Sequence, residues 1–170
     1  MFMNNNDILS RLRYALDIKD VEMVEIFGLG GIQTTKEEVK EMLTKMKNTD
    51  ADEEDTEYGR TIDNTTLESF LNGFVTLKRG VQEDKQGNRQ TQFLMSSTNR
   101  NVNNIVLKKL KIALSLTSED MIAILHEAGV ELSKSELSAV LRKEGHRNYK
   151  ECGDRYARNF LKGLALRYRD

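Results

Sequence analysis

The feature of this sequence that most constrains its fold is an internal repeat. Residues 5–43 align with residues 103–141 at a constant offset of 98 without a gap, and 12 of the 39 aligned positions are identical. Unrelated segments of ordinary composition would share about two or three such positions. The match resumes at an offset of 90, where residues 70–73 (FLNG) align with residues 160–163 (FLKG). This pattern predicts two tandem copies of one folding unit.

The apolar positions inside the repeat predict α-helices. Leu9, Leu12 and Leu16 recur at helical spacing, and their counterparts in the second copy do the same. A Ser133-x-x-Glu136 capping box marks the start of a further helix. The chain also lacks proline, which suits helices joined by glycine and asparagine turns. We therefore predict an all-α fold in which two copies of a roughly four-helix unit are related by an internal pseudo-twofold axis.

Composition shifts along the chain divide it into three parts. We predict a first helical repeat over residues 1–80, a polar linker over 81–101 and a second helical repeat over 102–170. The first repeat carries an acidic insert, residues 50–57, which predicts a solvated loop. Paired asparagines stand before the first helix of each copy, where their side chains are expected to cap it.

Glycine stands inside the last predicted helix of each copy, at Gly73 and Gly163. A glycine in a helix interior costs about 1 kcal/mol relative to alanine. Its presence at matching positions therefore predicts that another helix backbone approaches closely there. We expect these glycines, together with Leu12 and Leu110, to lie in the faces through which the two copies pack.

Two features of composition bear on compartment and partners. A single cysteine precludes an intramolecular disulfide and fits a reducing compartment, and the N-terminus lacks the features of a signal peptide. With no apolar run long enough to cross a bilayer, we expect a cytoplasmic protein with no membrane contact. Residues 1–99 hold 12 basic and 18 acidic side chains (net −6), whereas residues 100–170 hold 14 and 9 (net +5). This polarity indicates either an anionic partner for the second half or attraction between the halves.

The residues that most often carry chemistry are few in this chain. His146, Cys152 and Asp154 are close in sequence, but short spacing is weak support for a catalytic triad. Asp154 is expected to cap the last helix, and Cys152 to be a small apolar residue near the core. With His126 the only other histidine, a closed zinc site would need carboxylates. We expect no catalytic residue, metal or cofactor; cysteine-based activity at Cys152 is the alternative.

Two functions remain open on these grounds. The leading hypothesis is a non-enzymatic binding or adaptor protein, because a duplicated helical scaffold offers surfaces without an evident reaction centre. The alternative is a nucleic-acid-binding protein that uses a helix-turn-helix-like layout in the basic second repeat. In that case the residues facing the bases would be Lys134, Ser135 and Ser138. The residues contacting phosphates would be Arg142, Lys143, Arg147, Lys150, Arg155 and Arg158.

Three sequence features together resemble a known family. They are residues 103–114 (NNIVLKKLKIAL), the segment 146–154 (HRNYKECGD), and the twin Phe-Leu-x-Gly motifs. Their combination resembles the YehS-like bacterial proteins, tandem-repeat proteins grouped as a domain of unknown function. The resemblance covers nearly the whole chain, apart from the acidic insert and the linker, which look longer here. It implies a small bacterial cytosolic protein and supplies no activity, substrate or functional residue.

Overall fold

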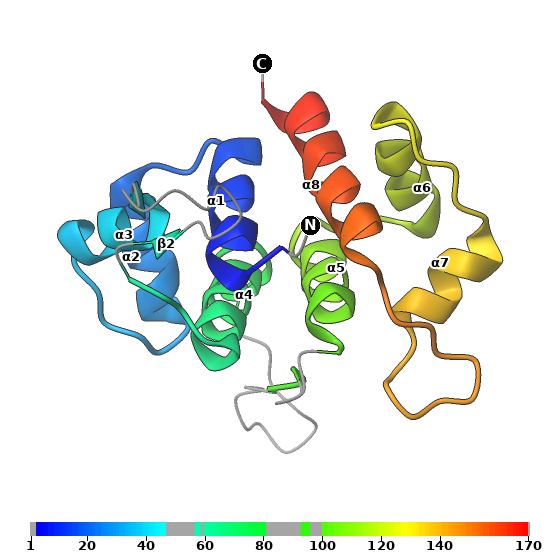
Figure 1. The fold of residues 1–170 in the computed structure, drawn as a ribbon, viewed down its shortest axis with the longest axis horizontal. Coiled ribbons are helices and arrows are strands. Elements are labelled where there is room, and N and C mark those ends of the chain that lie inside the picture. Colours follow the sequence, from blue (N-terminus) through cyan, green and yellow to red (C-terminus); the bar gives the residue numbers. More distant parts are fainter. Residues whose placement is uncertain (1–2, 47–56, 59, 81–92, 96–99, 170) are drawn as a thin grey trace.

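The computed structural model describes residues 3–46, 57–58, 60–80, 93–95 and 100–169. Within these ranges the chain forms eight helices (Figure 1). They are α1 (Asn5–Ala15), α2 (Asp20–Leu29), α3 (Lys36–Leu43), α4 (Asn64–Arg79), α5 (Val102–Ala113), α6 (Ser118–Glu127), α7 (Lys134–Leu141) and α8 (Asp154–Tyr168). Two-residue strands, β1 (Lys45–Met46) and β2 (Glu57–Tyr58), pair antiparallel between α3 and α4. The predicted all-α fold is confirmed, with this short ladder added.

Polar residues and glycines set the limits of the helices much as the sequence predicts. The Ser133 hydroxyl accepts from the backbone N–H of Glu136, while the Glu136 carboxylate accepts from the backbone N–H of Ser133. This reciprocal pair satisfies two backbone donors that the helix itself leaves unpaired. Gly31 (φ 93°) and Gly129 (φ 86°) follow α2 and α6 in the left-handed conformation that favours glycine.

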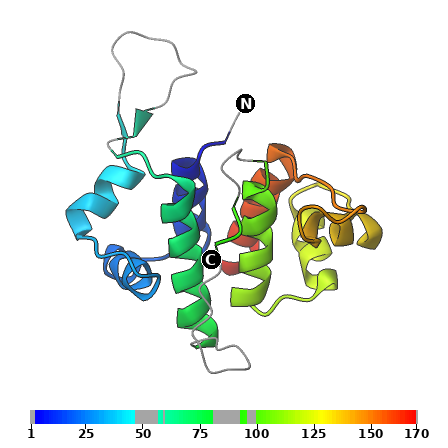
Figure 2. The ribbon, with the colours of Figure 1, turned by 90° about the horizontal axis from the view of Figure 1, so that it is seen from below.

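Four long helices, α1, α4, α5 and α8, form the centre of the molecule (Figures 1 and 2). On one side α2 packs against α4, and α3 against α1 and α2; on the other, α6 packs against α8, and α7 against α5 and α6. The buried apolar side chains of both sides belong to one continuous core. Phe27 and Phe70 lie within it at 4.9 Å between ring centroids, an aromatic contact between α2 and α4.

A buried asparagine near the start of α5 ties the loop before α8 to the core. The Asn104 side-chain amide donates to the carbonyls of Val140 and Lys150 at 2.9 and 2.8 Å. Its oxygen accepts from the backbone N–H of Cys152 at 2.9 Å. Asn6 makes the three equivalent bonds in the first half: its amide donates to the carbonyls of Met42 in α3 and of Arg60, and its oxygen accepts from the backbone N–H of Ile62. The prediction that these side chains cap their own helices is wrong, because each is buried in the first turn and satisfies a distant loop instead.

The close approach predicted at the helix glycines is present, but in a different place. A Cβ on Gly73 would lie 1.9 Å from the Ile26 carbonyl oxygen and 2.8 Å from the Gly30 nitrogen. A Cβ on Gly163 would lie 2.3 Å from the Ile124 carbonyl oxygen. These contacts join α4 to α2 and α8 to α6, within each half. The prediction that the glycines lie between the halves is therefore wrong.

One contact between the halves joins α4 to α5 and includes a buried charged cluster. The Glu68 carboxylate, 1% exposed, accepts from the backbone N–H groups of Leu94 (2.5 Å) and Met95 (2.9 Å). The Lys109 ammonium lies 3.9 Å from this carboxylate and donates to the Asn72 side chain at 2.7 Å. Burial lowers the pKa of Lys109, an effect that the Glu68 charge opposes. This part of the predicted linker is thus fixed to α4; residues 81–92 and 96–99, and residues 50–56 of the acidic insert, lie outside the described residues.

The other contact between the halves joins α1 to α8. The backbone N–H of Met3 donates to the Asp154 carboxylate at 2.9 Å. At the far end, the Arg169 guanidinium lies 4.1 Å from the centroid of the Tyr14 ring and donates to the Tyr14 carbonyl at 2.9 Å. The N-cap of α8 is Gly153, so the prediction that Asp154 caps this helix is wrong. Its carboxylate instead helps to join the two halves.

Candidate functional site

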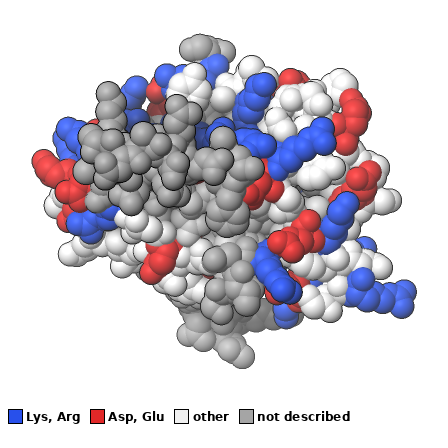
Figure 3. All heavy atoms as spheres, viewed as in Figure 1, with Lys and Arg blue, Asp and Glu red and all other residues white. Residues whose placement is uncertain are grey.

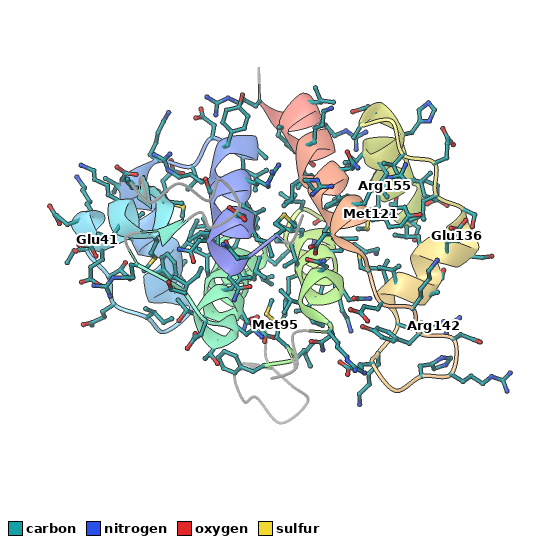
Figure 4. The ribbon with its side chains drawn as sticks, in the orientation of Figure 1. Glu41, Met95, Met121, Glu136, Arg142 and Arg155 are labelled. Carbon is teal, nitrogen blue, oxygen red and sulfur yellow. The ribbon has the colours of Figure 1, made fainter. Side chains whose placement is uncertain are left out.

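The nine residues proposed to contact nucleic acid do not form a single site. Lys134, Ser135 and Ser138 lie on the exposed face of α7, and Lys134 forms an ion pair with Glu119 at 2.7 Å. The others follow α7 or lie on α8, and all but the half-buried Arg158 are exposed: Arg142, Lys143, Arg147, Lys150, Arg155 and Arg158. Figure 4 shows Arg142 at the end of α7, well apart from Arg155 at the start of α8.

The segment between α7 and α8 concentrates exposed positive charge. Arg142, Lys143, Arg147 and Lys150 are exposed, and within the described part of the chain none has a carboxylate at ion-pair distance. Lys and Arg side chains project at this end of the molecule in Figure 3. In the first half Arg60 pairs with two glutamates of α3, while the exposed Lys36 and Lys40 have no ion pair within the described residues. The positive charge predicted for the second half therefore includes four exposed cations that form no ion pair with the described residues.

The segment proposed as helix-turn-helix-like consists of α6, a turn and α7, and its counterpart in the first half is α2, a turn and α3. Helix α6, the turn at Gly129 and α7 follow one another, and α6 contacts α7. The exposed face of α7 also carries Glu136 (Figure 4). Its negative charge would repel a phosphate that Lys134 attracts. Helices α3 and α7 lie at opposite ends of the long axis of the molecule (Figure 1). Helices α3 and α7, the third helix of each half, thus do not form one continuous surface.

A cavity of about 300 Å³ opens where α5, the end of α7, the following segment and the linker meet. Its walls are formed by Leu94, Asn101, Asn104, Ile105, Lys108, Val140, Leu141, Arg142, Lys143, Glu144 and Tyr149. Only Arg142 and Lys143 were among the predicted binding residues. Lys108 of α5 is half-buried. No sequence motif marks this cavity, since its walls come from three separate segments.

Some polar groups in the cavity wall have hydrogen-bond partners and others do not. Both ends of the Asn104 amide are engaged by the backbone, as described above. The Tyr149 hydroxyl is buried and has no hydrogen-bond partner within the described structure. Burial raises the pKa of Tyr149, with smaller contributions from the Glu144 and Glu151 charges. The cavity therefore combines a neutral phenol with the cationic side chains.

The chemistry considered for the segment 146–154 finds little support in its geometry. Cys152 is 3% exposed, and burial, followed by the Asp154 charge, raises the pKa of its thiol to about 12. His146 is exposed, and its Nδ1 accepts from the backbone N–H of Asn148 at 3.1 Å. Within the described ranges, no three His, Cys, Asp or Glu side chains come together in a group that would hold a metal.

We expect the Cys152 thiol to react slowly near neutral pH. With a pKa of about 12, the thiolate fraction at pH 7 is on the order of 10⁻⁵, against a few per cent for an ordinary cysteine. Alkylation by iodoacetamide, followed by mass spectrometry, should be at least about 100-fold slower for the native protein than for the protein in concentrated urea. Equal rates would show an accessible thiolate and would restore cysteine-based activity as a hypothesis.

Comparison with known proteins places the chain in a family. The model of the family "Protein of unknown function (DUF1456)" matches twice, over residues 5–80 and 103–170. The chain belongs to this family. It is also 39% identical over 165 residues to the "Uncharacterized protein YehS" of Escherichia coli (strain K12), a match that covers 97% of this chain and 96% of the relative. No solved structure matches the chain significantly. The resemblance to the YehS-like family is thus confirmed, and the family supplies no function.

Among the described helices, none has the length and apolar character required to cross a membrane.

Proposed function

We propose that the protein is a non-enzymatic binding protein whose basic second half engages an anionic partner in the cytoplasm. The observation that carries this proposal is the set of exposed cations after α7, Arg142, Lys143, Arg147 and Lys150, which lack ion pairs within the described residues. The segment also carries the exposed Glu144 and Glu151, but basic side chains outnumber them, and a positively charged surface raises the local concentration of anionic partners and speeds their association.

Nucleic acid is the second candidate partner. The α6–turn–α7 layout, with Lys134, Ser135 and Ser138 exposed on α7, favours it. A protein that neutralises phosphates in this way releases condensed counterions, so its affinity falls steeply as the salt concentration rises. An acidic polypeptide carries its charge at lower density, and we expect a shallower dependence on salt for such a partner.

The test measures binding of the full chain by fluorescence anisotropy, with a labelled DNA duplex and a labelled polyglutamate peptide as probes. We expect at least one probe to bind at low salt. The variant R147E/K150E should then bind it at least about tenfold more weakly, because each reversal replaces an attraction by a repulsion. The matched control is K36E/K40E, which reverses two exposed charges of α3 and should change the affinity less than about twofold. Failure of both probes to bind at low salt would contradict the proposal.

We also infer that the two halves, residues 1–80 and 102–170, are copies of one unit related by a pseudo-twofold axis. Three observations support this. The helix order recurs, and Asn6 and Asn104 make equivalent hydrogen bonds. In addition α4 packs against α5, and their counterparts in the other half, α8 and α1, pack against each other. A twofold relation requires this exchange of contacts, since each copy then presents the same surface to the other. An experimental structure in which the halves fail to superpose would refute it.

A further inference from the structure

We propose that the cavity between α5 and the end of α7 binds a small organic anion with an apolar or aromatic body. This proposal shares Arg142 and Lys143 with the proposed function but depends on the apolar walls of the cavity and on Lys108 rather than on Arg147 and Lys150. With about 300 Å³, the cavity is at the lower end of the range for small-molecule sites. A ligand of one or two rings fits that space, whereas a polymer does not.

The walls of the cavity contain both apolar and cationic side chains. Leu94, Ile105, Val140 and Leu141 supply the apolar contacts. The lining also contains three cations, Lys108, Arg142 and Lys143, against a single carboxylate, Glu144. A ligand that buries a hydrophobic body and presents a carboxylate, sulfonate or phosphate group satisfies both parts of the wall. A neutral or cationic ligand satisfies the apolar part alone.

Lys108 is the cation most specific to this cavity. It is half-buried on α5, whereas Arg142 and Lys143 are exposed. A partly desolvated cation interacts more strongly with an opposite charge than an exposed one does, because less water screens the pair. In the repeat alignment Lys108 corresponds to Ser10, so the first half has no equivalent cation at this position. The half-buried cation of the cavity is therefore particular to the second half.

The wall contributed by the linker is held in place from the first half. Glu68 of α4 accepts hydrogen bonds from the backbone N–H groups of Leu94 and Met95, and the Asn101 side chain donates to the Leu94 carbonyl at 2.6 Å. These bonds hold Leu94 in the cavity wall without a ligand. Preorganisation of this kind reduces the conformational entropy that binding would otherwise cost.

The proposal is tested with 8-anilinonaphthalene-1-sulfonate, an aromatic anion that fluoresces in apolar surroundings, and the full chain. We expect one molecule to bind per chain. N-phenyl-1-naphthylamine, which has the same rings without the sulfonate, should bind at least about tenfold more weakly. The variant Lys108→Gln should weaken binding of the anion by about five- to tenfold. The control Lys111→Gln, which removes another half-buried lysine of α5 outside the cavity, should leave the affinity unchanged.

Further measurements separate this site from the exposed cations and guard against an unfolded variant. The variant R147E/K150E should keep its affinity for the aromatic anion even where it loses the labelled polyanion, so the two proposals fail independently. If Lys108→Gln does not fold, the shift of the Asn101 side-chain amide signal on titration of the unaltered protein locates the ligand. Equal affinity for the charged and neutral probes, or an Asn101 signal that does not move, overturns the proposal.

Discussion

Replacement of Glu68 by alanine should lower the free energy of unfolding by about 3–5 kcal/mol, the range found when one partner of a buried ion pair is removed. The substitution removes a buried carboxylate that lies 3.9 Å from the buried Lys109 ammonium. It also leaves the N–H groups of Leu94 and Met95 without their acceptor. Urea denaturation followed by circular dichroism measures the change.

Two further variants show whether the charge is the cause. In the double variant E68A/K109M no buried cation remains, so we expect it to be more stable than Glu68→Ala alone. Glu25→Ala removes an exposed glutamate of α2 and should change stability by less than about 0.5 kcal/mol. If Glu68→Ala were as mild as Glu25→Ala, the carboxylate would not hold the linker as described.

The second large effect is expected at Gly73, where alanine should destabilise the protein by about 1–3 kcal/mol or more through overpacking. The added Cβ would lie 1.9 Å from the Ile26 carbonyl oxygen, which is backbone and cannot rotate away. Helices α2 and α4 must therefore move apart, which disturbs the packing of Phe27 on Phe70. Thermal and urea denaturation both report this loss.

Gly28 provides the matched control for that substitution. It lies in α2, and a Cβ there meets nothing within 4 Å. Gly28→Ala should therefore stabilise the protein, by up to about 1 kcal/mol, because alanine is the better helix former. Equal effects of the two alanine substitutions would show that close approach of α2 is not the reason for glycine at position 73.

The sequence predicted the parts of the fold that depend on local patterns. Helical spacing of apolar residues, the Ser133 capping box and the glycine at position 129 are local signals, and the structure contains each of them. What local patterns do not specify is which helix meets which. The close approach at Gly73 was therefore expected from the cost of glycine in a helix, whereas its partner, α2 of the same half, was not.

The candidate site was predicted only in part for the same physical reason. Arg142 and Lys143 stand out in sequence as members of a basic run. Lys108 looks like an ordinary solvated lysine until α7 and the linker are packed beside it, and Glu68 looks like one more surface acid. Burial and enclosure arise from tertiary contacts between segments far apart in the chain. A charge at an otherwise buried helical position was the one available signal for Glu68 and Lys109.

The continuous core that crosses the contact between the halves has an evolutionary consequence. A chain with two matching halves needs only one of them to acquire new chemistry, while the other preserves the shared architecture. Because both halves contribute side chains to the same interior, neither can change freely: a substitution that loosens the packing of one half also weakens the other.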